Sequence, residues 1–402
     1  MQSVILAAGK STRTYPLTLN KPKVLLPIAN KPLLQHNLEQ LKQLKQLGNV
    51  TEIIIVVGFE KEQIMKQFGN SFDGIPIRYV EQKEQLGTAH ALIQAKEYIS
   101  DSFIVMNGDD LYSHNDMERC IKSFEKHDAC VLAQQADNPE RFGVYITDNG
   151  LVKDIVEKPK TFVSNLINVG FYILNKSALD IKIDRSPRGE YEITDIIKKL
   201  AENGKVYCET VKDYWIPVGY PWNLLDANAH LLKYIENDIQ GEVESNATIK
   251  GNVKIGKGTL VKNGAYIEGP VVIGEKCNIG PNCFIRENTT IGNNCKIGNG
   301  VEIKNSIIMN NVAVCHLSYI GDSVIGNNVN IGAGNVTANL RHDNKNVKTP
   351  VGDDVIDSGR RKLGAVIAEG VHTGINTTIY PGRKIWPNKT TMPGEIVKSD
   401  IK

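Results

Sequence analysis

The stretch VVIGEKCNIGPNCFIRENTTIGNNCKI, residues 271–297, decides the fold of the second half of the chain. Within it an aliphatic residue recurs at every sixth position, and the residue two places before each one is small or branched. The same period extends outward without a break from Ile249 to Ile303. This repeat is typical of a left-handed hexapeptide-repeat β-helix, in which each hexapeptide forms a flat strand and a corner, and three hexapeptides close one coil. We predict that the aliphatic residues fill its interior.

The repeat is interrupted once before it ends. The period slips near Ile308, breaks across a polar segment at residues 340–362, and resumes at Ile367. Segments expelled from a regular solenoid often carry function. Cys277 and Cys295 occupy equivalent positions three hexapeptides apart, so we expect them to stack in neighbouring coils as small core residues. The seven cysteines include no C-x-x-C pair, so they indicate neither a disulfide framework nor a zinc site.

The first half of the chain has a different pattern, in which short apolar runs alternate with helical segments. The apolar runs are residues 4–7, 53–57, 75–80, 103–106 and 169–174. This alternation predicts an α/β domain with a mostly parallel, Rossmann-like sheet and helices on both faces. We place this domain at residues 1–240 and the all-β domain at residues 241–402. Ligands of such sheets bind beyond the carboxyl ends of the strands, which here means the loops after residues 7, 80, 106 and 156.

Composition excludes several classes of protein. The 402 residues suffice for two or three domains, with 41% hydrophobic and 23% charged residues. A net charge of +2 is too balanced for a protein whose main partner is nucleic acid. No stretch approaches the roughly 20 apolar residues of a membrane span, and the first residues lack the features of a signal peptide. We therefore expect a cytoplasmic protein with no membrane partner.

A small-residue loop with nearby cations follows the first apolar run. It reads Leu6-Ala-Ala-Gly-Lys-Ser-Thr-Arg13, with Lys21-Pro-Lys23 a few residues later. Backbone N–H groups of such a loop can approach phosphates, and Arg13 and Lys23 supply fixed positive charge. Further polar motifs follow later strands: Gln82 with Gly87-Thr88-Ala89, Asn107-Gly-Asp109-Asp110, Glu157-Lys-Pro159 and Asn168-Val-Gly170.

Together these motifs resemble the sugar-1-phosphate nucleotidylyltransferases, whose signature is similar to L-A-A-G-x-G-T-R followed by K-P-K. The resemblance implies that Arg13 and Lys23 are catalytic and act on the transferring phosphate of UTP or dTTP, and that Asp109 carries Mg²⁺. The implied nucleotide-binding residues are Leu6, Ala7, Ala8, Gly9, Gln82, Gly87 and Thr88. The implied sugar-phosphate-binding residues are Gly143, Glu157 and Asn168. A sugar 1-phosphate is already an anionic nucleophile, so this chemistry needs no general base.

Two positions depart from the family pattern. Ser11 stands where the second glycine of the loop is usual. Residues 216–218 read Ile-Pro-Val, where the family commonly has an acidic metal ligand. Asp110, Asn223 or Asp226 could compensate, or Asp109 and the substrate phosphates could hold the metal alone.

The interrupted part of the repeat contains a second group of polar residues. Cys315-His-Leu-Ser-Tyr-Ile-Gly-Asp322 is followed by Asn330-Ile-Gly-Ala-Gly334 and then by a loop from Asn339 to Lys348. An imidazole has a pKa near 6.5, so His316 is the natural general base here. Lys345 and Lys348 could bind a phosphate.

These segments resemble the acetyltransferase half of the bifunctional N-acetylglucosamine-1-phosphate uridylyltransferase/glucosamine-1-phosphate acetyltransferases, of the archaeal type. The resemblance implies acetyl-CoA as co-substrate, His316 as the base that takes the proton of the sugar amine, and a homotrimer formed through the β-helix. The implied acetyl-acceptor-binding residues are Arg286, Lys304, Tyr319, Asn339, Lys345 and Lys348. The implied acetyl-CoA-binding residues are Ala333, Ser358 and Arg361.

Two other interpretations compete with a bifunctional enzyme. The β-helix could serve only oligomerisation or regulation, but the grouping of His316, Asn339 and Lys345 argues against this. A non-catalytic scaffold similar to the translation-initiation exchange factors conflicts with the retained cationic loop and Asp109. The sequence leaves open which amino sugar, glucosamine or galactosamine, and which pyrimidine nucleotide are preferred.

Overall fold

The computed structural model describes all residues, 1–402. Contacts divide the chain into two compact units. The first consists of Met1–Lys10 and Leu33–Pro217, and the second of Ser11–Pro32 and Val218–Lys402. The second unit thus takes in a loop from near the start of the chain as well as the repeat region. The functional boundary at residues 240/241 remains a prediction.

A ten-stranded sheet forms the centre of the first unit, in the order β10-β11-β13-β9-β12-β7-β1-β4-β6-β5. Its middle strands β7, β1, β4 and β6 are parallel, whereas β12 runs antiparallel between β7 and β9. The Rossmann-like α/β domain predicted from the sequence is therefore confirmed, with parallel pairing at the centre of the sheet and mainly antiparallel pairing in the strands that flank it. Its strands are β1 (Gln2–Ala7), β4 (Glu52–Val57), β5 (Ser71–Phe72), β6 (Ile75–Glu81), β7 (Phe103–Asn107), β9 (Ala129–Gln135), β10 (Gly143–Asp148), β11 (Leu151–Glu157), β12 (Leu166–Leu174) and β13 (Val206–Thr210).

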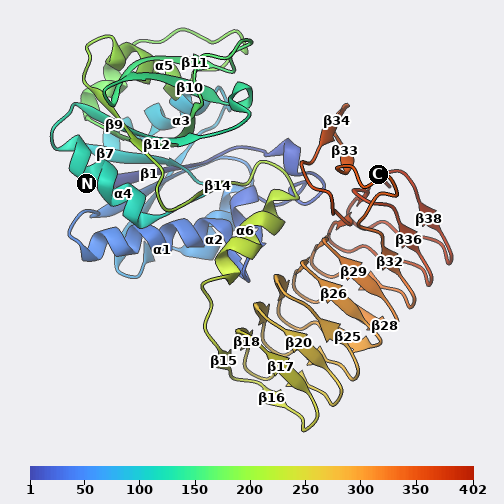
Figure 1. The fold of residues 1–402 in the computed structure, drawn as a ribbon. Coiled ribbons are helices and arrows are strands. Elements are labelled where there is room, and N and C mark those ends of the chain that lie inside the picture. Colours follow the sequence, from blue (N-terminus) through green and yellow to red (C-terminus); the bar gives the residue numbers. More distant parts are fainter. The chain divides into compact units, whose positions relative to one another are not determined.

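Helices cover both faces of this sheet, with α3 and α5 on one side and α1 and α4 on the other (Figure 1). Their sequences explain the packing, since each buries one apolar stripe. In α5, for example, Ile193, Ile196 and Ile197 are buried against the sheet core. The helices of this unit are α1 (Leu33–Gln46), α2 (Lys61–Phe68), α3 (Thr88–Gln94), α4 (His114–Phe124) and α5 (Ile193–Ala201). A separate ribbon pairs β8 (Asp110–Tyr112) with β14 (Trp215–Pro217).

The second unit is a β-helix whose walls are three parallel sheets. The first wall contains β15 (Asp238–Ile239), β18 (Val253–Ile255), β21 (Val271–Ile273), β24 (Thr289–Ile291), β27 (Ile307–Ile308), β30 (Val324–Ile325), β35 (Val366–Ile367) and β37 (Lys384–Ile385). The second contains β16 (Glu242–Val243), β19 (Leu260–Val261), β22 (Asn278–Ile279), β25 (Lys296–Asn299), β28 (Ala313–His316) and β31 (Asn330–Ile331). The third contains β17 (Thr248–Lys250), β20 (Tyr266–Glu268), β23 (Phe284–Ile285), β26 (Glu302–Lys304), β29 (Tyr319–Gly321), β32 (Val336–Thr337), β36 (Thr378–Ile379) and β38 (Ile396–Val397).

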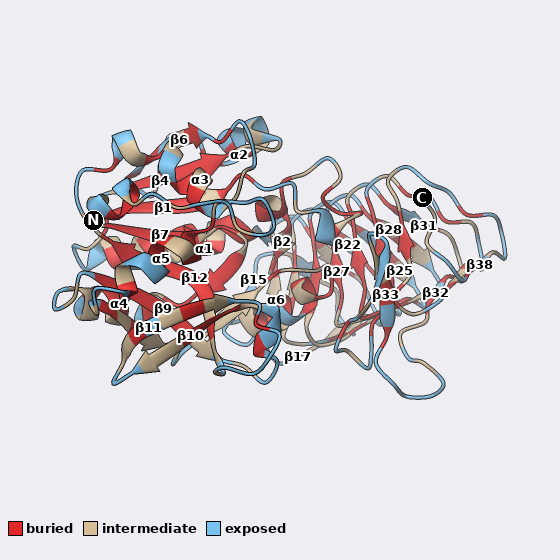
Figure 2. Ribbon diagram, turned by 90° about the horizontal axis from the view of Figure 1, so that it is seen from above, coloured by how far each residue is buried: buried red, intermediate tan, exposed pale blue.

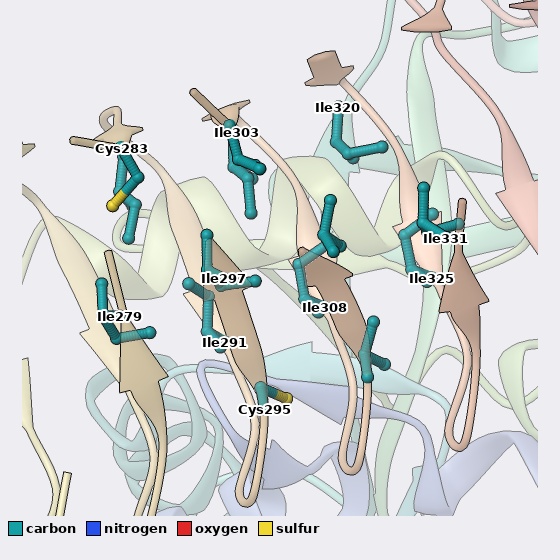
Figure 3. Close-up of a cluster of buried hydrophobic side chains, with 14 of the residues drawn as sticks. Ile279, Cys283, Ile291, Cys295, Ile297, Ile303, Ile308, Ile320, Ile325 and Ile331 are labelled. Atoms are coloured by element: carbon teal, nitrogen blue, oxygen red, sulfur yellow. The ribbon is translucent and has the colours of Figure 1, made fainter. Parts of the chain in front are cut away.

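The interior of the β-helix is filled by the residues of the six-residue repeat (Figure 3). From Ile255 to Ile303 the aliphatic positions are all buried, and the small positions between Ala265 and Val301 are buried beside them. Figure 2 shows the buried residues following the strands of the coils. Cys277 and Cys295 stack as predicted, because the backbone nitrogen of Cys295 lies 3.4 Å from Cys277 Sγ. All the cysteines are free thiols.

The predicted slip and break of the period correspond to two changes in the coils. Ile273 pairs with Ile291, which lies three full hexapeptides further along the chain. Ile291 in turn pairs with Ile308, which lies one residue short of three hexapeptides. After Ile325 the next partner is Ile367, because residues 340–362 leave the coil. This extruded segment forms a hairpin of β33 (Lys348–Val351) and β34 (Asp354–Asp357). The corners of the shortened coils carry asparagines with positive φ, a conformation that asparagine tolerates better than most residues.

Helix α6 (Asn223–Leu232) and the early segment Ser11–Pro32 complete the second unit. The ribbon of β2 (Pro27–Ile28) and β3 (Lys31–Pro32) lies in this early segment. Asn228 of α6 accepts a hydrogen bond from the Ala29 N–H at 2.9 Å and donates one to the Asn288 carbonyl at 2.9 Å. Asn30 donates to the Ile291 carbonyl at 2.6 Å. Helix and early loop are therefore fastened to the β-helix by amide contacts. No helix of the structure has both the length and the apolar composition needed to cross a bilayer.

Candidate active sites

The loop predicted to hold phosphates leaves β1 at the carboxyl edge of the sheet in the first unit. Ala7 pairs with Val57 of β4, and Leu6 pairs with Asn107 of β7, so the ends of three strands meet there. The Leu6 and Ala8 carbonyls accept hydrogen bonds from neighbouring loops, at 2.9 and 3.2 Å. Gly9 is exposed, and a Cβ on it would meet no atom within 4 Å. The backbone at Gly9 is thus open to a ligand.

The residues predicted to contact the base follow β6 at the same edge. Gln82 is buried, and its amide nitrogen lies 3.1 Å from both the Gly87 carbonyl and His90 Nδ1. Gly87 has φ +111°, and a Cβ on it would lie 2.7 Å from the Tyr191 backbone nitrogen. Only glycine fits both conditions. The Thr88 hydroxyl accepts a hydrogen bond from the Ile193 N–H at the start of α5, which ties this loop to the neighbouring helix.

The three residues predicted to bind the sugar phosphate come together on β10, β11 and β12. Gly143 pairs with Glu157, and a Cβ on Gly143 would lie 2.9 Å from Glu157 Oε2. Burial raises the pKa of the Glu157 carboxyl, and the nearby carboxylate of Glu192 raises it further. The Arg188 guanidinium, 3.4 Å from Glu157 Oε1, lowers this pKa. Asn168 Oδ1 accepts hydrogen bonds from the Tyr145 hydroxyl and the Gly170 N–H, both at 3.0 Å. Its orientation is therefore fixed before any ligand binds.

The predicted metal ligand Asp109 lies in the turn between β7 and β8. Asp110 follows it and pairs across the ribbon with Pro217, one of the positions where the family pattern has an acidic residue. Asp110 Oδ2 lies 3.4 Å from Asn107 Nδ2 and 3.5 Å from the Tyr112 hydroxyl. No cluster of three or more His, Cys, Asp or Glu side chains is arranged to hold a metal ion. The donor set fits Mg²⁺ in the mode that uses one or two carboxylates together with substrate phosphates.

The predicted catalytic cations belong to the second unit. Lys23 is buried and donates a hydrogen bond to the Val218 carbonyl at 2.7 Å. Arg13 is exposed, with its guanidinium 5.5 Å from the Tyr220 ring centroid. Both cations thus gather on the segment at residues 218–220. Ser11 has φ +53°, so the position at which the family prefers glycine does have a left-handed backbone here.

Two residues considered as substitutes for the missing acid have other contacts. Asn223 Oδ1 accepts the Tyr220 N–H at 2.9 Å and so caps the turn before α6. Asp226 forms an ion pair with Arg360 of the extruded segment. Asp226 therefore binds a cation of the β-helix unit.

Four residues predicted to bind the acetyl acceptor meet on the third wall of the β-helix. Arg286, Lys304 and Tyr319 follow or lie on successive strands β23, β26 and β29, and Lys304 pairs with Gly321. Arg286 forms an ion pair with Glu302 at 3.2 Å. Asn339 Nδ2 donates to the Tyr319 hydroxyl at 3.1 Å. Tyr319 is half-buried, and burial raises its pKa. The structure thus brings two cations and two hydrogen-bonding groups to one face.

The predicted general base His316 ends β28, at the corner that leads to Tyr319. Its side chain is exposed and forms no hydrogen bond within the chain. Its backbone carbonyl accepts the Gly334 N–H at 3.2 Å and so holds the corner in place. The imidazole is therefore accessible to a ligand bound beside the third wall.

The two lysines predicted to bind phosphate lie on or beside the extruded hairpin. Lys345 and Lys348 are exposed, and neither side chain forms an ion pair or a hydrogen bond. The base of the hairpin is firmly held, because the Lys348 carbonyl accepts from Arg383 at 2.9 Å and the Thr349 hydroxyl donates to the Gly382 carbonyl at 2.6 Å.

The residues predicted to bind acetyl-CoA occupy two different places. Ala333 lies at the corner after β31, where its carbonyl accepts the Asn376 N–H. Ser358 is buried, and its hydroxyl donates to the Val347 carbonyl at 2.6 Å. Arg361 is exposed and donates to Asn344 Oδ1 at 3.1 Å. Beside it a cationic pocket of about 400 Å³ is lined by Arg360, Arg361 and Lys362.

Several charged residues at these sites escaped prediction from the sequence. Arg188 binds both oxygens of the buried Glu192 at 2.6 Å and reaches Glu157. Asp322, the last residue of the quoted histidine motif, is buried beside Asn339. The run S-P-R-G-E-Y-E at residues 186–192 marks a turn before a helix and could have drawn attention to Arg188.

Comparisons with known proteins cover the whole chain. Residues 2–234 match the nucleotidyl transferase family, and residues 267–399 match the GMPPB C-terminal domain. The chain is 45% identical over 407 residues to the bifunctional protein GlmU of Methanococcus maripaludis strain C7, covering 100% of this chain and 95% of that one. It is 40% identical over 406 residues to the bifunctional sugar-1-phosphate nucleotidylyltransferase/acetyltransferase of Sulfurisphaera tokodaii, covering 100% and 98%.

Among solved structures, a Bacillus anthracis protein described as a glucose-1-phosphate thymidylyltransferase superposes with a TM-score of 0.53 and 31% identity, over 59% of this chain and 97% of that one. That likeness supports the fold found for the first half. The two relatives, in contrast, match the chain in its entirety. It therefore belongs to the family of bifunctional GlmU-type proteins, transferases that combine nucleotidyl transfer and acetyl transfer in one chain.

Proposed function

We propose that the chain catalyses two successive reactions of UDP-N-acetyl-amino-sugar synthesis. In the first, the amine of glucosamine 1-phosphate, with galactosamine 1-phosphate as the alternative, is acetylated from acetyl-CoA. In the second, a uridylyl or thymidylyl group passes from UTP or dTTP to the acetylated sugar phosphate, and pyrophosphate is released. The observation that carries this proposal is the polar group of Arg286, Lys304, Tyr319 and Asn339 beside the unpaired imidazole of His316.

The acetyl transfer requires a neutral amine. His316 takes a proton from the ammonium of the sugar, and the amine nitrogen then attacks the thioester carbonyl carbon. The C–S bond breaks, and the proton that is lost from nitrogen restores the thiol of coenzyme A. Arg286 and Lys304 neutralise the sugar phosphate, while Tyr319 and Asn339 orient the ring. Lys345 and Lys348 extend the positive charge from the hairpin, and Ala333, Ser358 and Arg361 belong to the proposed acetyl-CoA side.

The nucleotidyl transfer requires no base. An oxygen of the sugar 1-phosphate attacks the α-phosphorus, and the bond to the pyrophosphate oxygen breaks. Arg13 and Lys23 neutralise the charge that develops on the transferring phosphate. The open loop from Leu6 to Gly9 supplies backbone donors. Gln82, Gly87 and Thr88 hold the pyrimidine base, and Gly143, Glu157 and Asn168 hold the sugar.

Mg²⁺ is the proposed metal of this step, held by Asp109 with Asp110 as the neighbouring oxygen donor. When bound, the ion offsets negative charge on the triphosphate. Support comes from the position of both carboxylates directly after β7, with Asp110 opposite Pro217.

We propose in addition that the chain forms a homotrimer through the β-helix. Large apolar side chains remain exposed on or beside its third wall, among them Leu317, Val336 and Ile396. Burial of such residues against other copies would remove apolar surface from water. The cytoplasmic location expected from the sequence stays a prediction.

The decisive experiment uses the purified full chain. Thiol release from acetyl-CoA is measured with glucosamine 1-phosphate and with galactosamine 1-phosphate, and pyrophosphate release from UTP or dTTP with the acetylated product. Lys23→Ala is expected to abolish pyrophosphate release with thiol release intact, and His316→Ala to do the reverse. No thiol release from wild type with either amino sugar would refute the acetyltransferase assignment.

A further inference from the structure

Asp322 is a buried carboxylate at the edge of the proposed acetyl-acceptor site. Its side chain is only 4% exposed. Oδ1 accepts a hydrogen bond from Asn305 Nδ2 and Oδ2 accepts one from Asn339 Nδ2, both at 2.6 Å. An ionised carboxylate buried to this degree is destabilised unless donors and an opposite charge surround it.

Asp322 determines which way the amide of Asn339 points. A carboxylate can only accept hydrogen bonds, so it must face Nδ2 of the amide and never Oδ1. The second hydrogen of the same Nδ2 goes to the Tyr319 hydroxyl. Both donors of Asn339 are thus used within the protein. Oδ1 forms no hydrogen bond in the structure and remains as an acceptor, which suits a ligand that carries N–H or O–H groups.

The opposite charge comes from Arg360, whose guanidinium lies 3.7 Å from Asp322 Oδ1. The same guanidinium forms an ion pair with Asp226 of helix α6. Its side chain is 18% exposed, and Nε donates to the Lys362 carbonyl at 3.3 Å. Arg360 therefore stands between two carboxylates that are distant from each other in the chain.

Helix α6 belongs to the residues that match the nucleotidyl transferase family, which end at residue 234. The acceptor face belongs to the β-helix. Five polar side chains thus connect a helix of the nucleotidyltransferase sequence with the acetyl-acceptor site, each in contact with the next: Asp226, Arg360, Asp322, Asn339 and Tyr319.

We infer that Asp322 is a positioning residue for acetyl transfer: it fixes the amide of Asn339 with Oδ1 toward the amino sugar, and Arg360, held by Asp226, keeps the Asp322 carboxylate in place. This inference rests on the proposed function, because it takes Asn339 as a ligand of the acetyl acceptor. A substitution in helix α6 should therefore change the affinity for the amino sugar, although it alters no residue that touches the sugar.

The first test is Asp322→Asn in the full chain. Asp322 has φ +49°, a conformation that asparagine tolerates well, so the variant is expected to fold, which a thermal melt verifies. An asparagine can face Asn339 with either end of its amide, so the orientation of Asn339 is no longer fixed. Loss of a hydrogen bond to a charged partner corresponds to about a tenfold to hundredfold change. The KM for the amino sugar phosphate should rise by about that factor, with the KM for acetyl-CoA and the pyrophosphate release unchanged.

A double-mutant cycle distinguishes positioning from a merely structural role. If Asp322 acts through Asn339, Asp322→Asn adds nothing to Asn339→Ala, and the double variant has the same KM for the amino sugar as the single Asn339→Ala variant. Independent effects that add would overturn the inference. An unchanged KM in Asp322→Asn would do the same.

The remaining variants examine the link to α6. Arg360→Gln should raise the KM for the amino sugar phosphate. Arg360→Lys should raise this KM less, because a positive charge remains beside Asp322. Asp226→Asn removes a half-exposed ion pair, so a rise of about twofold to fivefold is expected. Exposed Lys398→Gln and Asp238→Asn are the matched charge controls and should leave the KM unchanged.

The proposed function and the role of Asp322 can be refuted separately. No thiol release by wild type with any amino sugar phosphate would overturn the proposed function and this inference with it. Normal release by wild type, together with wild-type KM values in Asp322→Asn and Arg360→Gln, would overturn the inference alone.

Discussion

Lys384→Met is expected to change how stability depends on pH. Lys384 lies on β37, is 2% exposed, and donates from Nζ to the Pro350 carbonyl in the extruded hairpin. Burial lowers its pKa from the ordinary 10.5 to about 8, with Asp400 acting in the opposite direction and Arg383 and Lys402 reinforcing the decrease. The cause is that a charged ammonium loses its hydration on entering the protein.

The sign follows from proton binding in the two states. Below pH 8 the lysine is charged both folded and unfolded, and the full penalty of burying the charge applies. Between pH 8 and pH 10.5 the unfolded chain holds a proton that the folded chain has lost, so the free energy of unfolding rises with pH. Over this whole range the gain amounts to at most about 3 kcal/mol.

The assay is urea unfolding of wild type and of Lys384→Met at pH 7.5 and at pH 10. Every other titrating group cancels in the difference between the two proteins. Relative to wild type, the variant should therefore lose about 2–3 kcal/mol of stability between the two pH values. Exposed Lys389→Met is the matched control and should follow wild type. If the difference between Lys384→Met and wild type is the same at both pH values, the reasoning is refuted.

Three further substitutions have clear expectations. Gly87→Ala places a Cβ against the Tyr191 backbone, so we expect a loss of about 3 kcal/mol in unfolding free energy and a raised KM for the nucleotide. Ile297→Ala opens a cavity in the β-helix and should destabilise it by about 2–5 kcal/mol in urea unfolding, whereas Lys296→Ala on the outer surface should have little effect. Ser11→Gly relieves a left-handed backbone and should raise stability by about 1 kcal/mol with pyrophosphate release retained; a loss of stability would contradict this.

The β-helix could be predicted because its interior positions recur at a fixed spacing in the sequence. Each aliphatic residue points into the core regardless of what lies elsewhere in the chain, so Ile267 or Ile285 is recognised from local context alone. The shortening of the coils after Ile291 is visible in the sequence only as a slip of the period, and the pairing of Ile291 with Ile308 is seen only in the structure. In the first unit, β10 is not predicted as a strand and β11 only by its end at residue 156, since short alternating runs separated by a turn carry a weak signal.

The polar networks of the sites could not be predicted from the sequence, for a different reason. The residues of the first sugar pocket were identified from motifs, but Arg188 acquires its importance only through Glu157 on another strand. Nothing in the sequence pairs Asp226 with Arg360, because an ion pair between distant segments leaves no periodicity. The missing acid at Pro217 left Asp110, Asn223 and Asp226 as possible substitutes, and the ribbon register brings Asp110 opposite that position.

Residues 11–32 belong to the second unit, so they must wait for their partners while the chain is synthesised. This segment leaves the ribosome early, but its partners in α6 and the β-helix follow only after residue 218. At roughly 5–20 residues per second, the ribosome needs on the order of 10–40 s to add the intervening residues. During that interval the strands of the first unit's sheet are themselves synthesised, the last of them β13, while the loop with Arg13 and Lys23 has none of its partners. A nascent chain that stops before α6 would therefore have a formed sheet and an unsupported cationic loop.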